Sequence, residues 1–185
     1  MRIRLVEGRW WRIEADLPER WTWDGFEQPR NRFDPASGRF RVRYAARTPV
    51  TAARERFPHR LVHEADGDLW VVPLDGPGRV LALTHQDTLD ALELDDRVST
   101  GRIGADDDPL LEVCWNLSDA VHDWFAPRPP AILYRSRRLP SSRNLAFTEA
   151  SDLRPGAARP LRHATALLTV LVARHGFAVP TGWLA

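Results

Sequence analysis

The spacing of hydrophobic and polar positions changes several times along this chain, and each change predicts a new structural element. Between residues 39 and 46, Phe40, Val42 and Tyr44 alternate with arginines, which is the period of a strand with one apolar face. Other apolar runs predict strands over residues 2–6, 10–15, 68–74, 79–83, 131–137 and 144–148. The third and fourth of these runs are expected to pair across the intervening Asp-Gly-Pro-Gly turn.

Residues that begin and end helices predict the remaining elements. Thr48 suits the N-cap and Pro49 the first turn of one helix, and Thr84 followed by Asp87 resembles the capping box of another. Gly176 suits the C-terminal end of the last helix. Helices are therefore predicted over residues 48–57, 84–92, 108–125 and 160–175.

The composition is that of an ordinary globular chain. Its 185 residues are 43% hydrophobic and 28% charged, and we expect one domain over residues 1–185. All 26 basic residues are arginine, which excludes Schiff-base chemistry and a phosphate loop that uses lysine. The single cysteine excludes a disulfide framework within the chain. The N-terminus has no apolar signal core, and the longest apolar run near the C-terminus, residues 164–173, is too short to span a membrane. A cytoplasmic protein is therefore expected.

Charge is distributed unevenly between two neighbouring segments. Residues 30–60 contain nine arginines against Asp34 and Glu55, a local net charge of +7. Residues 64–108 contain twelve acidic residues against three arginines, a local net charge of −9, whereas the whole chain is +1. A cationic pocket attracts phosphate groups, and the planar guanidinium of arginine suits bidentate contacts with them. A solvated strand face whose charges pair elsewhere would produce the same pattern.

Two histidines follow the first predicted helix. His59 and His63 are four residues apart with Glu64 adjacent, and on one helix they would share a face as zinc ligands do. Pro58 disfavours that helix and the sequence offers no third ligand, so no metal site is expected. His59 is a better candidate for lining a phosphate pocket, and the alternative is a histidine on the surface.

Four residues occur in an order and spacing that resemble a known family. Arg32 lies in a turn-rich loop, Tyr44 in the run RYAARTP, Glu55 in TAARERF, and Ser136 in ILYRSRRLPSSRNLAF. Together these segments resemble the RES domain, which is named after an arginine, a glutamate and a serine. The resemblance covers residues 10–147.

Two parts of the chain are less well matched by this resemblance. The loop around Arg32 reads Asn-Arg-Phe-Asp, whereas many members have a Gly-Arg-Trp-Asn type of loop, so Arg30 and Arg39 are alternatives for the family's arginine. A C-terminal helical tail, residues 157–176, lies beyond the resemblance. It is expected to cover the sheet or to serve an interface, such as that of a homodimer.

The resemblance implies an α+β fold similar to that of the ADP-ribosyltransferases, in which a split antiparallel sheet clasps NAD. NAD would be the substrate, and no cofactor would be required. Glu55 would stabilise the positive charge that develops on the ribose as nicotinamide leaves, as carboxylates do in glycoside hydrolysis. Arg32 would hold the pyrophosphate, Tyr44 would stack against nicotinamide, and Ser136 would fix the nicotinamide-ribose end.

The resemblance also implies partners and a biological role. Family members transfer ADP-ribose to phosphate, to water or to a protein, and many are toxins that deplete NAD. An NAD phosphorylase or glycohydrolase is therefore expected, with phosphate as a potential co-substrate. Such toxins are held in check by an antitoxin of the Xre type, which has a helix-turn-helix DNA-binding domain. Contact with nucleic acid would then occur only through that partner.

The same residues also allow other interpretations. The protein could be a non-catalytic module that binds RNA or DNA, although its near-neutral net charge and acidic middle segment argue against this. It could also bind nucleotides without turnover. Structurally, Glu55 could be a surface acid of its helix, Tyr44 a core aromatic, Ser136 a strand hydroxyl and Arg32 a surface cation.

Overall fold

A computed structural model describes residues 2–76, 78–101 and 109–184 of the chain. The predicted helix start at Asp108, the turn residue Pro77 and the acidic residues 106–108 lie outside these ranges. The described chain combines one large sheet with helices that are not in strict alternation with its strands. The α+β class expected from the sequence is therefore confirmed.

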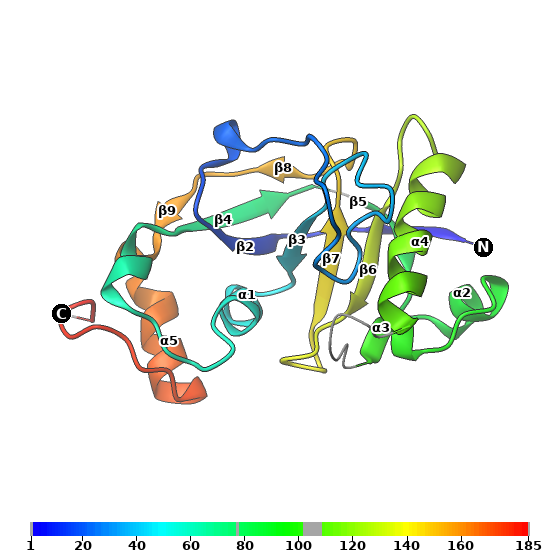
Figure 1. Cartoon of the computed structure of the whole chain (residues 1–185). Coiled ribbons are helices and arrows are strands. Elements are labelled where there is room, and N and C mark those ends of the chain that lie inside the picture. Colours follow the sequence, from blue (N-terminus) through cyan, green and yellow to red (C-terminus); the bar gives the residue numbers. More distant parts are fainter. Residues whose placement is uncertain (1, 77, 102–108, 185) are drawn as a thin grey trace.

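The strands form one strongly twisted sheet (Figure 1). Within the described residues the strands are β1 (Ile3–Val6), β2 (Trp10–Glu14), β3 (Arg43–Ala46), β4 (Trp70–Asp75), β5 (Gly78–Ala82), β6 (Ala131–Arg135), β7 (Arg143–Phe147), β8 (Arg154–Pro155) and β9 (Arg159–Pro160). Their order is β1-β5-β6-β7-β3-β2-β4-β8, and β9 also pairs with β4. The β5–β6 pair is parallel and the other described pairs are antiparallel, so the sheet is mixed.

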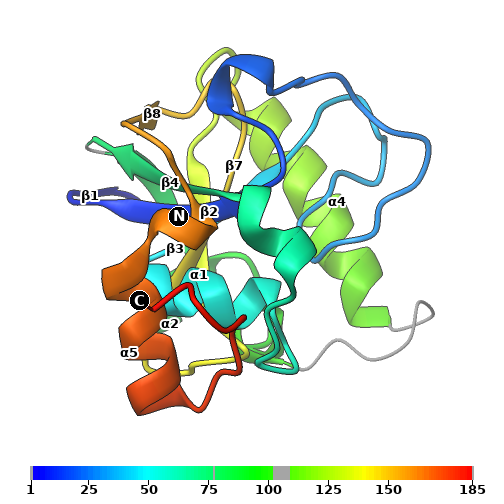
Figure 2. The same cartoon turned by 90° about the vertical axis from the view of Figure 1, so that its left-hand side faces the viewer.

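The helices lie at two ends of this sheet. They are α1 (Pro49–Arg56), α2 (Gln86–Ala91), α3 (Arg97–Thr100), α4 (Pro109–Trp124) and α5 (Thr165–His175), with the 3-10 helices η1 (Pro18–Arg20), η2 (Glu64–Asp68) and η3 (Leu161–His163). Figure 1 shows α1 and α5 below β2 and β4, and α2, α3 and α4 beside β6. Figure 2, from the side, shows α5 in front and α4 towards the back. The two groups of helices thus leave the middle of the sheet between them.

The ends of α1 and α5 follow the predicted signals. The Thr48 side chain accepts a hydrogen bond of 3.1 Å from the backbone nitrogen of Thr51, and Pro49 begins the helix. Gly176 ends α5 in the left-handed conformation, with φ of 64°, which an L side chain rarely adopts. Both helices are confirmed. The one at the C-terminus is preceded by the separate short helix η3.

The predicted pairing of β4 with β5 is wrong. β4 pairs with β2, β8 and β9, whereas β5 pairs with β1 and β6. Four of the six residues of β4 and four of the five of β5 are buried. Strands buried to this extent need neighbours along their edges and cover on their faces, which a hairpin alone does not provide.

Three smaller predictions also need correction. β3 begins only at Arg43, because Phe40 makes an isolated bridge with Asp24 instead of joining the ladder. The helix expected after Thr84 is α2, but its N-cap is His85, and the buried Thr84 hydroxyl has no hydrogen-bond partner among the described residues. β6 is shorter than predicted and ends one residue before the candidate Ser136.

The buried side chains form three clusters that explain this arrangement. One packs α1 and α5 onto the sheet and includes Ala46 of β3, and a second packs α4 onto β5 and β6 with Tyr44 of β3 at its edge. The third, which contains Ala45, lies on the opposite face. Since alternate residues of a strand face the same side, the first two clusters share one face. The candidate site lies where they meet.

Candidate active site

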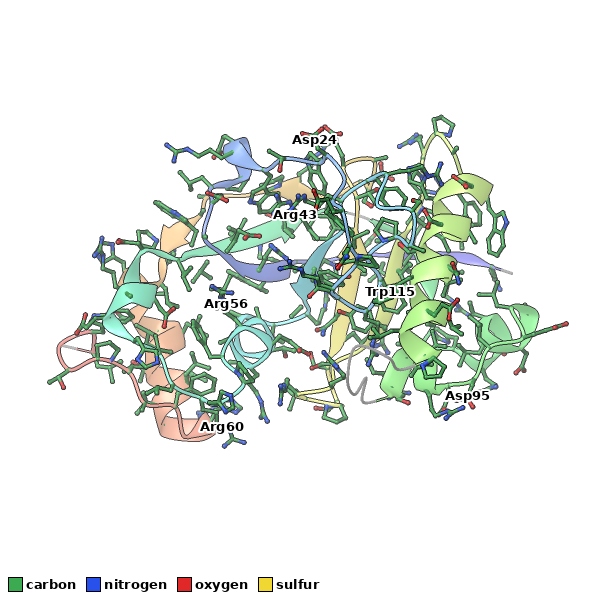
Figure 3. The ribbon with its side chains drawn as sticks, in the orientation of Figure 1. Asp24, Arg43, Arg56, Arg60, Asp95 and Trp115 are labelled. Atoms are coloured by element: carbon green, nitrogen blue, oxygen red, sulfur yellow. The ribbon has the colours of Figure 1, made fainter. Side chains whose placement is uncertain are left out.

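A cavity of about 600 Å³ lies where α1 approaches the middle of the sheet. It is lined by β2, β3, α1, the loop of residues 26–42, Leu111 of α4, and residues of β6, of the turn after it and of β7. Pockets for small-molecule ligands are roughly 300 to 1,000 Å³ in volume. In Figure 3 the labelled Arg43 and Arg56, which line the cavity, lie nearer the centre of the molecule than Arg60 and Asp95.

The cavity is strongly cationic. Its charged lining consists of Arg12, Arg30, Arg32, Arg41, Arg43, Arg56 and Arg137 against Glu14, Asp34 and Glu55. Glu14 accepts hydrogen bonds from both Arg12 and Arg43, the latter at 2.9 Å. Arg30, Arg56 and Arg137 are exposed, and within the described residues their side chains make no ion pair. These three guanidinium groups are therefore available to anionic groups of a ligand.

Glu55, in the last turn of α1, connects three elements of the fold. The Oγ of Ser136, directly after β6, donates a hydrogen bond of 2.6 Å to Oε1 of Glu55, and Nδ2 of Asn144 on β7 donates one of 2.9 Å to the same oxygen. Ser136 is 2% exposed and Asn144 4% exposed. Oε2 of Glu55 has no hydrogen-bond partner in the part of the chain that the structure describes. One carboxylate oxygen is thus held while the other stays available at the cavity wall.

Hydrogen bonds within the turn between β6 and β7 hold Ser136 in place. Its Oγ accepts a hydrogen bond of 3.0 Å from the nitrogen of Leu139, and its own nitrogen donates to the carbonyl of Ser142 at 3.1 Å. Thr51 Oγ1, on α1, donates to Ser142 Oγ at 2.9 Å. Helix α1 and this turn are therefore joined at two points, once through Glu55 and once through Thr51.

Arg32 lines the cavity, but its guanidinium is bound to the end of α3. Nη1 donates to the carbonyl of Ser99 at 2.7 Å and to that of Val98 at 3.4 Å, and Nη2 donates to the carbonyl of Gly101. The Arg32 Cζ also lies 5.6 Å from the ring centroid of Tyr134. Burial lowers the pKa of the Arg32 guanidinium from its ordinary value. The residue is 5% exposed, so it is not the surface cation considered from the sequence.

Tyr44 and Asp34 together hold the loop at the cavity wall. The Tyr44 hydroxyl donates to Asp34 Oδ1 at 2.9 Å and accepts from the nitrogen of Phe33 at 3.0 Å. Asp34 Oδ2 accepts from the backbone nitrogens of Arg30 and Asn31, at 2.9 and 2.7 Å. Burial raises the pKa of the Tyr44 phenol well above its ordinary value, and the charge of Asp34 adds to this. Tyr44 therefore remains a neutral donor at physiological pH.

A second phenol, that of Tyr134 on β6, lines the cavity beside Glu55. Its ring packs edge-to-face on Phe33, with the centroids 4.9 Å apart. Burial raises the pKa of the Tyr134 phenol, and the nearby charge of Glu55 raises it further. Both phenols of the cavity are thus neutral groups that can donate hydrogen bonds.

Arg39 does not contribute to this cavity. Its guanidinium forms hydrogen-bonded ion pairs on α4, with Asp123 at 3.0 Å and Asp119 at 3.4 Å. Of the three arginines considered from the sequence, Arg30 and Arg32 line the cavity.

His59 lies outside the cavity as well. It is exposed and lines a separate, open hollow of about 340 Å³, whose border with the cavity is formed by Arg56. Among the described residues, no group of three or more His, Cys, Asp and Glu side chains could hold a metal ion.

The structure brings together four of the five residues singled out in the sequence and adds others. Arg32, Tyr44 and Glu55 line the cavity, and Ser136 contacts Glu55. Asn144 was missed, although an asparagine directly before the apolar run Leu-Ala-Phe is a usable signal for a buried polar contact. Asp34 and Tyr134 were missed too, because a turn aspartate and a strand tyrosine are common without any such role.

The residues that form this cavity lie within a segment that matches a known protein family. A model of the RES domain matches residues 9–168, which is most of the chain. The chain belongs to the RES domain family. The match includes all the cavity-lining residues and continues past residue 147, where the sequence resemblance was expected to end, into the first turn of α5. RES domains are associated with NAD-related enzymatic activity and are typically part of toxin–antitoxin systems.

Further comparisons found no matching curated protein and no matching solved structure for this RES domain. Its likeness to ADP-ribosyltransferases therefore stays a prediction. None of the helices in the described ranges is long and apolar enough to cross a membrane.

Proposed function

We propose that this RES domain is an NAD-consuming enzyme that cleaves the bond between nicotinamide and ribose and transfers ADP-ribose to phosphate or water. The observation that carries the proposal is the Glu55 carboxylate, which Ser136 and Asn144 hold by one oxygen at the wall of an arginine-lined cavity. A fixed negative charge beside a cationic, phosphate-attracting surface suits a substrate with a pyrophosphate and a ribose that becomes positively charged during reaction.

The chemistry needs no general acid. Nicotinamide is a cation in NAD, and when the glycosidic bond breaks it takes the bonding electron pair and leaves neutral. The anomeric carbon becomes an oxocarbenium-like cation, which a preorganised carboxylate stabilises more strongly than the ground state. An oxygen of phosphate or water then bonds to that carbon, and water loses a proton. Glu55 is assigned the electrostatic role in this sequence.

The remaining residues are assigned to binding. Arg30, Arg56 and Arg137 offer guanidinium groups without ion pairs within the described chain, and they are the candidates for contacting pyrophosphate or an incoming phosphate. Arg32 adds positive charge but is bound to three carbonyl groups. Tyr44 lines the cavity and is assigned to stacking on nicotinamide. His59 has no part in the proposal because it lies in the neighbouring hollow.

The biological role is proposed to be that of a toxin in a type II toxin–antitoxin system, since RES domains typically belong to such systems. Its inhibitor would be a separate protein with a helix-turn-helix domain of the Xre type. Expression without that partner should arrest bacterial growth and lower cellular NAD, and Glu55→Gln should relieve both effects. Growth arrest that persists with Glu55→Gln would contradict the assigned mechanism.

Nicotinamide release tests the enzymatic proposal. Purified protein is incubated with NAD across a phosphate titration, and nicotinamide and the ADP-ribose product are identified chromatographically. The cationic cavity predicts faster turnover with phosphate and formation of phosphorylated ADP-ribose. Free ADP-ribose at every phosphate concentration would identify water as the acceptor instead. If no condition releases nicotinamide, the enzymatic proposal is wrong.

A further inference from the structure

The buried side chain of Asn144 is only partly satisfied by hydrogen bonds. Its Nδ2 donates to Glu55 Oε1 at 2.9 Å, while its Oδ1 is buried without a hydrogen-bond partner in the described chain. Leaving a buried acceptor unsatisfied costs about 1 to 3 kcal/mol. Buried polar groups are nearly always satisfied in native proteins, so the placement of this side chain calls for an explanation, and its contact with Glu55 offers one.

The backbone around Asn144 is suited to holding a group still. β7 lies inside the sheet between β3 and β6, and Asn144 is paired with Ala46 on one side and Tyr134 on the other. A residue with strand neighbours on both sides has little freedom to move, so its side chain can define the position of a partner.

Glu55 lacks this support on its own helix. Helix α1 is short, ending at Arg56, and Glu55 lies next to its end, where helices fray. A flexible glutamate has several rotamers in which its carboxylate would leave the cavity wall. The two donors from the sheet side, Ser136 and Asn144, select one of them.

Both donors act on the same oxygen, which has a direct consequence for the chemistry. Ser136 and Asn144 engage Oε1, so Oε2 keeps its full capacity to interact with a ligand. Had each donor taken a different oxygen, both would be hydrogen-bonded by the protein and the carboxylate would be less available. Oε1 is therefore held by the protein, and Oε2 is the oxygen that can interact with a ligand.

We propose that Asn144 is a positioning residue of the reaction, which fixes Oε1 of Glu55 from the rigid strand β7 and thereby directs Oε2 to the substrate. This inference rests on the proposed function, since it concerns the residue to which that function assigns the chemistry. Asn144 lines the cavity, but in this role it acts through Glu55 and need not touch NAD. Its loss should therefore reduce kcat while leaving KM almost unchanged.

The test is a double-mutant cycle on nicotinamide release from NAD by the full chain. Asn144→Ala is expected to lower kcat about tenfold to a hundredfold, as for loss of one hydrogen bond to a charged group, with KM within about threefold of the wild type. In the Glu55→Gln background the same change should lower kcat by less than about threefold, because the charge that Asn144 positions is already absent. A purely structural role would give equal losses in both backgrounds.

Two further variants keep the outcome decisive. Asn144→Asp preserves size and shape but replaces the donor with an acceptor against Oε1, so it should lower kcat at least as much as Asn144→Ala, and it serves if the alanine variant fails to fold. Thr148→Val is the control. It removes a buried hydroxyl just beyond β7 that has no hydrogen-bond partner among the described residues, and Thr148 does not line the cavity. The kcat of this variant should match that of the wild type. Wild-type kcat in Asn144→Asp, or additive losses in the cycle, would overturn the positioning role. Failure of the wild-type protein to release nicotinamide would instead refute the proposed function.

Discussion

The hydroxyl of Ser136 donates a hydrogen bond of 2.6 Å to Oε1 of Glu55, although the two residues are 81 positions apart in the chain. Ser136 follows β6 and Glu55 lies near the end of α1, so the contact joins the sheet to the helix at the cavity wall. It also changes the role expected for the serine. Because its hydroxyl hydrogen is donated to Glu55, we expect Ser136 to act on the carboxylate and only indirectly on the nicotinamide-ribose end of NAD.

This relationship predicts the kinetics of Ser136→Ala. A hydrogen bond to a charged group contributes about 1.5 to 3 kcal/mol, so kcat for nicotinamide release should fall about tenfold to a hundredfold while KM changes little. Ser141→Ala, an exposed serine of the same turn, is the matched control and should behave as wild type. If Ser136→Ala instead raises KM and retains kcat, the serine contacts NAD directly.

Arg32 should be needed more for stability than its position in the cavity suggests. Arg32→Ala leaves the carbonyls of Ser99, Val98 and Gly101 without their donors. The free energy of unfolding, measured by urea denaturation, should fall by about 1 to 3 kcal/mol. Unchanged stability together with a large increase in KM would show that the guanidinium leaves the carbonyls to bind the substrate.

Arg30 should show the opposite behaviour. Its side chain is exposed at the cavity without an ion pair in the described residues, so Arg30→Ala should barely change the unfolding free energy. KM for NAD should rise about tenfold if one charge-assisted phosphate contact is lost. Arg39→Ala is the matched control, because Arg39 pairs with Asp119 and Asp123 outside the cavity and its loss should leave KM unchanged. Equal KM values for Arg30→Ala and wild type would remove Arg30 from the phosphate site.

The two tyrosines predict an unusual alkaline titration. Tyr44 and Tyr134 are the only tyrosines of the sequence, both line the cavity, and burial raises the pKa of each phenol above its ordinary value of about 10. A folded-state pKa above the unfolded value means that this contribution to stability is complete below about pH 10 and is lost as the pH rises towards the folded pKa. The chain has no lysine, so lysine titration does not obscure the effect.

The corresponding measurement follows tyrosinate absorbance and circular dichroism together while the pH is raised past 10. We expect tyrosinate to appear only as the fold is lost. Tyrosinate that forms near pH 10 in a protein with native circular dichroism would contradict the burial of these phenols.

Local signals in the sequence predicted local structure well in this protein. Thr48 and Pro49 identified the start of α1, Gly176 identified the end of α5, and apolar runs located most strands. Pairing between strands was less predictable. β4 and β5 follow each other across a turn, which favours a hairpin, but burial of both strands places each between other neighbours.

The site was predictable as a set of residues but not as a set of contacts. Arg32, Tyr44 and Glu55 do line one cavity, yet the sequence does not show that Arg32 binds carbonyls of residues 98–101 or that Tyr44 binds Asp34. Such contacts join segments that are distant in the chain, and no local pattern reports them. Asn144 illustrates the point, since its partner becomes visible only when β7 and α1 are placed side by side.

The central claim is that the charge of Glu55 stabilises the transition state for loss of nicotinamide, and steady-state kinetics of Glu55→Gln test it most directly. Glutamine preserves size and hydrogen-bonding capacity but removes the charge, and the ribose is positively charged only as the bond breaks. We predict that kcat for nicotinamide release falls by about two orders of magnitude or more, on the order of 3 kcal/mol, with little change in KM. A Glu55→Gln variant that retains the wild-type kcat would contradict the account.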